Sequence, residues 1–176
     1  QAKLLWDDEF LYVAFDCADA SIWGERTARD SPVYRDDCVE LFVSPDPDRL
    51  ELYFNIEMNV KGAALDHFHP RGPGSKADWN PAGIQIATTV QGTLNQDGEA
   101  DKSWRLEAAI PFAAYAAVAK NTPPKEGDVW RLNLNRLNYD KPAGQTRLQR
   151  SQWAPGDPDR PSFHAPQWFG KVVFGD

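Results

Sequence analysis

Several stretches with a strand-like pattern carry polar side chains of types that bind ligands. These side chains are Glu40, then Tyr53, Asn55, Glu57 and Asn59, then Arg105 and Glu107, and then Arg131, Asn133 and Asn135. Asn is depleted in strands, so its repeated use there needs a local reason. Amides, carboxylates and guanidinium groups together donate and accept hydrogen bonds, as recognition of a neutral polyhydroxylated ligand requires. An ordinary solvated sheet face is the alternative interpretation.

Aromatic side chains outside the predicted core positions could supply the apolar part of such a site. The C–H face of a sugar ring packs on flat apolar rings, and such rings are common in small-molecule sites. The candidates are Tyr34, Trp23, Trp79, Trp153, Phe163 and Trp168. For each of them, packing within a loop or the core is the competing role.

One pair of carboxyl groups, Glu40 and Glu57, could act as a catalytic acid and base. A retaining glycosidase needs about 5 Å between its two carboxyl groups, a distance that the sequence does not give. The chain has no G-x-S-x-G, P-loop, G-x-G-x-x-G or H-E-x-x-H motif. We therefore expect a binding protein, and we keep a glycoside-processing enzyme as an alternative.

Candidate metal ligands are few. Cys17 and Cys38 are too few for a four-thiolate site, and they can form one disulfide or remain buried thiols. His67 and His69 alternate as two ligands on a strand would, but histidines of a surface loop are the simpler interpretation. No metal site is therefore predicted from these residues.

Hydrophobicity alternates with a period of two along most of the chain, and turn residues interrupt it at short intervals. This pattern predicts an all-β fold, a two-sheet antiparallel β-sandwich with jelly-roll-like, immunoglobulin-like layering. The predicted strands are Lys3–Trp6, Phe10–Cys17, Cys38–Val43, Leu52–Val60, Ile84–Gln91, Trp104–Ile110, Val129–Asn135 and Lys171–Phe174. Pro111, followed by apolar residues at helical spacing, predicts one short helix. The Pro- and Gly-containing stretch Asp66–Gly83 is predicted to be a long irregular loop.

Composition limits the partners of the chain. Its 176 residues are 41% hydrophobic and 26% charged, values typical of one globular domain, so we treat residues 1–176 as a single domain. The formal net charge of -7 opposes binding to nucleic acid or to anionic membranes and favours a neutral or cationic ligand. No apolar run of about 18 residues is present, so we expect no membrane span.

Five stretches together resemble a family 9 carbohydrate-binding module. They are Leu4–Val13, Asp37–Asp46, Phe54–Asn59, Arg105–Phe112 and the closing segment Asp159–Gly170. The resemblance covers nearly the whole chain, and the combination is specific although each stretch alone is generic. It implies non-catalytic binding of a sugar or oligosaccharide end between two aromatic side chains, with polar side chains beneath the sugar.

On the family pattern, Tyr34 and Phe163 take the two aromatic positions, and Asn59 and Asn135 lie beneath the sugar. The family usually has tryptophan at both aromatic positions and arginine at the position of Glu57. We therefore expect a ligand that differs from the ends of cellulose or xylan. The full set of expected ligand-binding residues is Tyr34, Glu40, Glu57, Asn59, Arg131, Asn135, Phe163, Trp79 and Trp153.

The resemblance carries further expectations about context. A structural calcium ion is the candidate cofactor, with the acidic loops 46–48 and 157–159 as candidate ligands and solvated turns as the alternative. The module is expected to belong to a secreted or periplasmic protein, beside or attached to a catalytic domain. It is also expected to lack the first N-terminal strand of the family.

A second class of binding protein shares this architecture. Related sandwiches of the DOMON type hold haem b between a methionine and a histidine. Here the ligands would be Met58 with His67, His69 or His164. Met58 alternates with core residues, which favours carbohydrate binding over haem binding.

Overall fold

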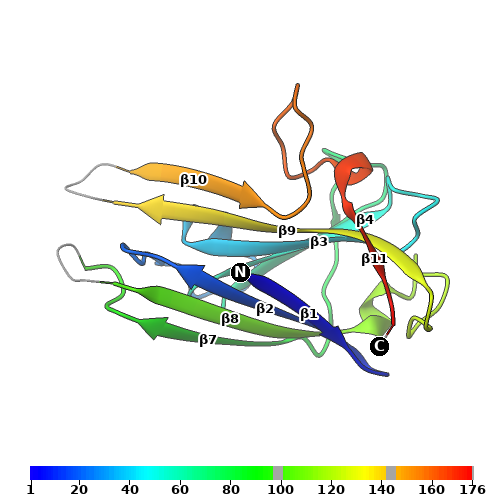
Figure 1. The fold of residues 1–176 in the computed structure, drawn as a ribbon, viewed down its shortest axis with the longest axis horizontal. Coiled ribbons are helices and arrows are strands. Elements are labelled where there is room, and N and C mark those ends of the chain that lie inside the picture. Colours follow the sequence, from blue (N-terminus) through cyan, green and yellow to red (C-terminus); the bar gives the residue numbers. More distant parts are fainter. Residues whose placement is uncertain (97–100, 142–145, 176) are drawn as a thin grey trace.

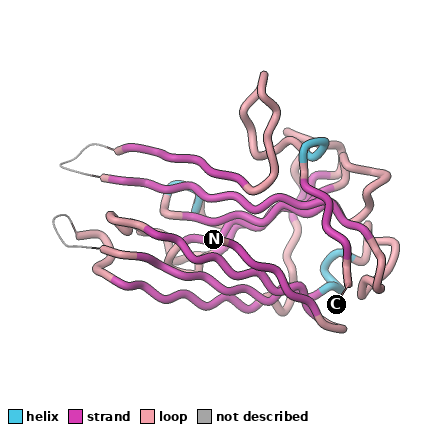
Figure 2. The backbone as a smooth tube through the Cα atoms, viewed as in Figure 1, coloured by secondary structure: helices cyan, strands magenta, loops and turns pink. Residues whose placement is uncertain are grey.

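Two antiparallel β-sheets packed face to face make up the computed structural model, which describes residues 1–96, 101–141 and 146–175 (Figures 1 and 2). The strand order of sheet A is β1 (Ala2–Trp6), β2 (Phe10–Ala18), β8 (Ser103–Pro111) and β7 (Gln85–Gln91). The strand order of sheet B is β10 (Arg147–Gln152), β9 (Val129–Asp140), β3 (Cys38–Ser44), β4 (Tyr53–Asn59), β5 (Ala64–His69) and β6 (Ala77–Asp78). A seventh strand of this sheet, β11 (Gly170–Val173), also pairs with β9. The predicted two-sheet β-sandwich is confirmed.

The main core lies between the sheets. Phe54, Ile56 and Met58 of β4 point into it and are at most 1% exposed. Each fully buried side chain of this size stabilises the fold by about 1.5–3 kcal/mol. The strand β2 of sheet A alternates between buried and partly exposed positions, as expected of a sheet with one solvated face. By contrast, β3 and β4 are buried at every position, so the outer face of sheet B is also covered.

Loop segments and short 3-10 turns cover the outer face of sheet B. Two segments of the chain pack on this face: the segment around η1 (Val33–Arg35) and the segment from β10 to η4 (Pro166–Trp168). Phe42 and Tyr53 point outward from β3 and β4 and pack against Phe169. The polar residues of this face therefore lie beneath other segments of the chain and not in bulk water.

Two predicted elements differ from the structure. The predicted loop Asp66–Gly83 is wrong at residues 66–69, which belong to β5, and at residues 77–78, which form β6. The start of β5 shows no apolar alternation because Asp66, on the core side, is buried and pairs with Arg29. The predicted short helix is a single 3-10 turn, η2 (Phe112–Tyr115), whose two aromatic residues are buried in the core. Within the described part of the chain, no helix has the length and apolar character needed to cross a membrane.

The two cysteines are separate buried thiols. Cys17 lies in the main core between the sheets, whereas Cys38 belongs to a smaller cluster with Val33, Leu65 and Leu137 on the outer side of sheet B. Of the two alternatives that the sequence left open, the structure therefore has the unpaired thiols.

Candidate functional site

A cavity of about 540 Å³ opens over the outer face of sheet B. Four of the predicted ligand-binding residues line it, namely Tyr34, Glu40, Glu57 and Phe163. These residues come from η1, β3, β4 and the chain between β10 and η4, so the fold brings together side chains that are far apart in the sequence. The other polar residues at the cavity, which the sequence analysis did not predict to bind sugar, are Lys76, Arg150, Ser151, Gln152, Asp157, Ser162 and His164.

The cavity floor belongs to a row of polar side chains that crosses sheet B. Glu57 of β4 pairs in register with Glu40 of β3, Glu40 pairs with Asn135 of β9, and Asn135 pairs with Gln152 of β10. Residues directly opposite each other on antiparallel strands have Cβ atoms about 4.5–5.5 Å apart. The strands that form the centre of the sheet therefore hold these side chains close together.

Four polar atoms of this row make no hydrogen bond within the described part of the chain. They are Oε2 of Glu40, Oε2 of Glu57, and both Oδ1 and Nδ2 of Asn135. The exposed fractions of the three residues are 4%, 6% and 2%. Leaving a buried polar group unpaired costs about 1–3 kcal/mol, so native proteins pair such groups with protein, water or ligand. Of these three residues, Glu40 and Glu57 line the cavity and can therefore form hydrogen bonds with a molecule in it.

Burial changes the acidity of the two carboxyl groups. Burial and then the neighbouring Glu57 raise the pKa of Glu40 well above its usual value, while Arg150 acts in the opposite direction. Burial raises the pKa of Glu57 to about 7, against the opposing effects of Lys76 and the Asn55 amide. Two carboxyl groups this close do not both ionise readily, so near neutral pH the pair retains a proton.

A buried hydrogen-bond network fixes the orientation of Glu57. Nδ2 of Asn55 donates to Oε1 of Glu57 over 3.0 Å, and Nε2 of His69 lies 2.7 Å from Oδ1 of Asn55. His69 stacks on Tyr53 with ring centroids 4.3 Å apart, and the Tyr53 hydroxyl lies 2.9 Å from Nδ1 of His164. Burial lowers the pKa of His69 to about 4, so its ring is neutral and donates through Nε2. Because Oε1 of Glu57 is engaged in this way, Oε2 is the oxygen left for a ligand.

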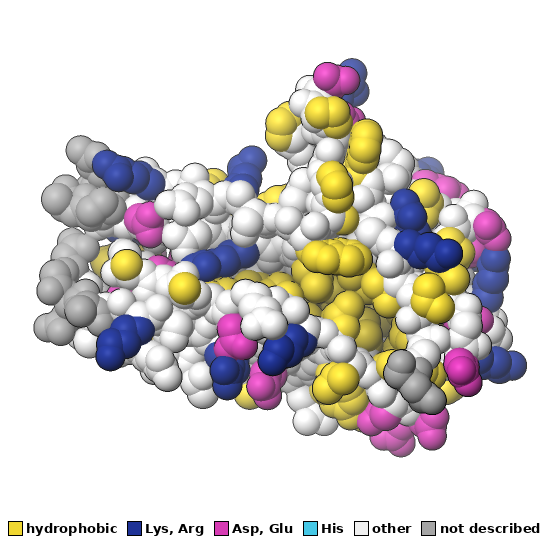
Figure 3. Space-filling model, in the orientation of Figure 1, with side chains coloured by type: hydrophobic (Ala, Val, Ile, Leu, Met, Phe, Trp, Pro, Cys, Tyr) yellow, Lys and Arg dark blue, Asp and Glu magenta, His cyan; other side chains and the backbone are white. Residues whose placement is uncertain are grey.

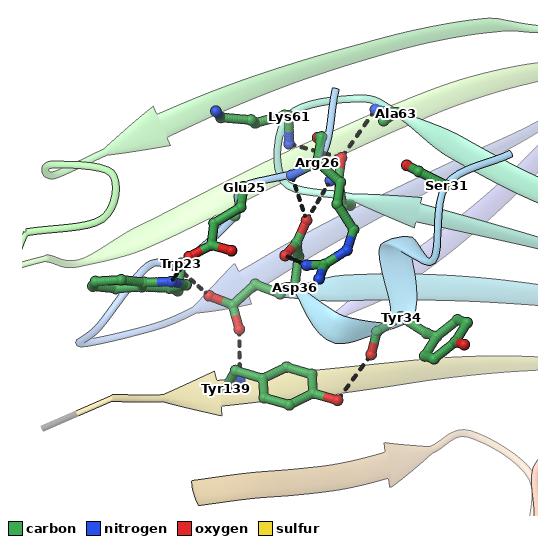
Figure 4. Close-up of polar contacts among 12 residues, drawn as sticks. Trp23, Glu25, Arg26, Ser31, Tyr34, Asp36, Lys61, Ala63 and Tyr139 are labelled. Carbon is green, nitrogen blue, oxygen red and sulfur yellow. Dashed lines mark hydrogen bonds and ion pairs between the residues drawn. The ribbon is translucent and has the colours of Figure 1, made fainter. Parts of the chain in front are cut away.

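A second network holds Tyr34 at the cavity wall (Figure 4). The buried Asp36 carboxylate accepts hydrogen bonds from Arg26 and from Nδ2 of Asn59, the latter over 2.8 Å. The Tyr139 hydroxyl donates to the backbone oxygen of Tyr34 over 2.9 Å. The backbone at Tyr34 is therefore anchored, and its ring, which is 38% exposed, remains available at the cavity.

Phe163 forms another part of the wall. It is partly buried against the outer clusters that contain Phe42 and Leu137. The loop between β10 and η4 projects from the body of the protein, and hydrophobic side chains gather near its base (Figures 1 and 3). Apolar packing thus supports Phe163, while the rest of its loop stands out into solvent.

Three predicted polar residues are not part of the cavity lining. Asn59 accepts from the backbone N–H groups of Lys61 and Ala63 through Oδ1, so its amide stabilises the β4–β5 turn and the Asp36 network. Arg131 lies toward η4, where its guanidinium reaches the backbone oxygen of Gln167 at 3.5 Å. Asn135 lies beside Glu40 in the same row, but it borders a second cavity of about 480 Å³ and not the first.

Two predicted tryptophans also lie elsewhere. The Trp79 indole N–H donates to the backbone oxygen of Ala114, and its ring packs against Phe54 in the core with centroids 4.6 Å apart. Trp153 is 53% exposed, borders the second cavity and lies over Gly170, where a Cβ atom would come within 2.1 Å of its ring. The structure therefore gives both rings a packing role.

The haem alternative does not fit the geometry. Met58 is fully buried and points into the core between the sheets. His67 and His69 pair in register with Asn55 and Tyr53, and His164 contacts the outward-facing Tyr53 hydroxyl, so all three histidines lie on the opposite face of sheet B. A haem iron between Met58 and one of these histidines would have to pass through the sheet.

In one of the two acidic loops, salt bridges engage the candidate calcium ligands. In loop 46–48, the Asp46 carboxylate pairs with Arg49 and Lys120, and Asp48 also pairs with Lys120. Across the described residues, no group of three or more His, Cys, Asp or Glu side chains lies together in a way that could hold a metal ion. The side chains of this loop do not fit calcium, which needs several free oxygen ligands.

The sandwich fold and the cavity with a polar floor and aromatic walls are typical of a carbohydrate-binding module. The model of carbohydrate-binding family 9 matches residues 3–174, and the chain belongs to this family. It is 25% identical over 171 residues to the endo-1,4-beta-xylanase A of Thermoanaerobacterium saccharolyticum, an alignment that covers 97% of this chain and 12% of the xylanase. The function of the family to which the chain belongs is carbohydrate binding.

Two solved structures have a similar fold. A Bacteroides uniformis protein, provisionally assigned to carbohydrate binding, has a TM-score of 0.75 and 22% identity, and the match covers 99% of this chain and 77% of that protein. A family 9 carbohydrate-binding module from Caldicellulosiruptor kristjanssonii, solved in complex with glucose, has a TM-score of 0.65 and 16% identity, with 98% and 74% coverage. These likenesses support the fold.

Proposed function

We propose that the cavity over sheet B binds the end of a sugar chain between Tyr34 and Phe163 and above the floor residues Glu40, Glu57 and Asn135. The observation that carries this proposal is that Glu40 and Glu57, each with a buried carboxyl oxygen that has no hydrogen-bond partner, line the same cavity as the aromatic rings of Tyr34 and Phe163. Sugar hydroxyls donate and accept, so they match a floor that offers carboxyl oxygens and an amide. The solved relative with bound glucose supports a single sugar unit as the minimal ligand.

We infer that binding takes place without hydrolysis. The family to which the chain belongs binds carbohydrate, and Glu40 and Glu57 are only 4% and 6% exposed on the cavity floor. The pair is also built into two central strands that are buried at every position. A glycoside-processing enzyme would instead release reducing sugar from a polysaccharide, and Glu40→Gln would abolish that release.

The biological setting that we propose is a secreted or periplasmic protein in which this module acts beside a catalytic domain. The chain spans 12% of the length of the xylanase that it matches, which supports a modular arrangement. Fractionation of producing cells tests the location. Recovery of the protein only from the cytoplasm would contradict it.

Isothermal titration calorimetry with glucose, cellobiose and xylobiose tests the binding site. Because sugar hydroxyls exchange water hydrogen bonds for protein ones, the expected Kd lies at about micromolar to millimolar levels. Asn135→Ala should weaken binding about tenfold by removing two hydrogen-bonding atoms. The matched control is Asn80→Ala, which alters an exposed asparagine away from the cavity lining. Absence of binding to every sugar tested would refute the proposal.

A further inference from the structure

The two floor carboxyl groups have no close cation within the protein. Among the ion pairs of the described residues, none involves Glu40 or Glu57. The cations that line the same cavity are Lys76 and Arg150, and both are exposed residues with long side chains. Solvent weakens the influence of such charges on a buried group. The buried negative charge of the floor is therefore compensated mainly by retained protons.

A free oxygen on each carboxyl group defines a place for one small donor group. Oε2 of Glu40 and Oε2 of Glu57 are both buried and without partners, and the two residues pair directly across β3 and β4. A sugar hydroxyl has a single hydrogen and donates to one of these oxygens at a time. An ammonium group has three donors and a positive charge, so it can contact both oxygens at once and neutralise the charge that burial makes costly.

We propose that the cavity prefers a sugar end with a free amino group, and that the ammonium of this hexosamine lies between Oε2 of Glu40 and Oε2 of Glu57. This proposal rests on the proposed function, because it assigns a ligand class to the same site. The formal net charge of -7 also favours a cationic ligand over an anionic one. Neutral sugars remain ligands, since the aromatic walls and Asn135 act on them equally.

Proton release follows from this arrangement. Burial keeps a proton on the carboxyl pair near neutral pH, and an ammonium between the two groups favours their ionised forms. Binding of the amino sugar therefore releases protons to the buffer, whereas binding of the neutral sugar does not require it. The other charged or titratable groups that line the cavity are Lys76, Arg150, Asp157 and His164, and burial lowers the pKa of His164 to about 4, so its ring is neutral in this range.

Calorimetric titration of the wild-type protein with glucose, glucosamine and N-acetylglucosamine tests the preference. At a pH where its amine is protonated, glucosamine should bind about tenfold more tightly than glucose, which corresponds to about 1.4 kcal/mol. N-acetylglucosamine, which is neutral, should bind no more tightly than glucose. Titrations in two buffers of different ionisation enthalpy should reveal proton release for glucosamine alone. Equal or weaker binding of glucosamine would overturn the proposal.

The variant Glu57→Gln locates the ammonium. It should remove most of the preference for glucosamine over glucose, measured as the ratio of the two Kd values in the variant and in the wild type. The matched control is Glu107→Gln, which neutralises an exposed carboxyl on sheet A and should leave the preference unchanged. A preference that survives Glu57→Gln would overturn the assignment. If Glu57→Gln fails to fold, the wild-type comparison of the three sugars still decides the preference.

The two proposals fail in different ways. If glucose binds and glucosamine binds no better, the preference is refuted and sugar binding stands. If no sugar binds at all, the proposed function is refuted and the preference with it.

Discussion

Replacing Glu57 by glutamine should change how the stability of the domain depends on pH. Burial raises the pKa of this carboxyl from 4.5 to about 7, so the folded state holds the proton more tightly than the unfolded state. The stabilising contribution is therefore complete below about pH 4.5 and is lost as the pH rises through about 7. A shift of this size corresponds to about 3 kcal/mol, and the side chain is buried enough that solvent screening reduces it little.

The measurement is urea unfolding of wild type and Glu57→Gln over a series of pH values, followed by the fluorescence of the buried Trp104 and Trp130. Near pH 4.5 the two proteins should have similar free energies of unfolding, because a protonated carboxyl and an amide are both neutral. Above pH 7 the variant should be more stable than wild type by about 3 kcal/mol. Comparison of the two proteins at each pH cancels the titration of every group except Glu40, whose pKa Glu57 raises.

The control for this experiment is Glu107→Gln on the exposed face of sheet A, where the change in free energy of unfolding should be small at every pH. A constant difference between wild type and Glu57→Gln from acidic to alkaline pH would refute the reasoning. In that case the carboxyl would ionise as freely in the folded state as in the unfolded state.

Three further predictions concern the walls and the scaffold. Phe163→Ala should weaken glucose binding about tenfold in calorimetry, because it removes an aromatic ring from the cavity wall. The control Trp168→Ala removes an exposed ring outside the cavity lining and should leave the affinity for glucose unchanged. Equal effects of the two variants would contradict the assignment of Phe163 to the wall. Asp36→Asn should lower the free energy of unfolding, measured in urea, by about 3 kcal/mol, because the partly buried Arg26 loses its fully buried ion-pair partner. A decrease of less than about 1 kcal/mol would contradict a stabilising role for this ion pair. Burial raises the pKa of Cys17 to about 11, so its thiol should react with a disulfide reagent only after the protein unfolds. Rapid labelling of Cys17 in the folded protein would contradict the burial of this side chain in the core.

Strands were predicted most accurately from the sequence where one face of the strand packs against the apolar core. Phe54, Ile56 and Met58 alternate with polar residues, and β4 lies where the alternation places it. The strand β5 was missed because the buried Asp66 occupies a core-side position and the histidines occupy the other face. A charged residue at a core-side position interrupts the hydrophobic alternation from which a strand is predicted.

The candidate site could be predicted in part. Tyr34 and Phe163 were placed from the family resemblance, and the structure brings both to the cavity. The role of Asn59 was misjudged, although its position just before a turn with a glycine is typical of an asparagine that caps a turn. Lys76 and Arg150 reach the cavity only through tertiary folding, because β10 and the chain before β6 carry no pattern that predicts proximity to β3.

The burial of β3 at all seven positions limits how this protein can change its ligand over evolutionary time or by engineering. One side of the strand forms the core, and the other side includes the cavity floor at Glu40, so β3 has no solvent-facing position at which mutations accumulate without consequence. Tyr34 and Phe163, by contrast, lie in segments outside the strands. Libraries that diversify these two wall positions should therefore yield many more folded proteins with altered sugar preference than libraries that diversify the floor.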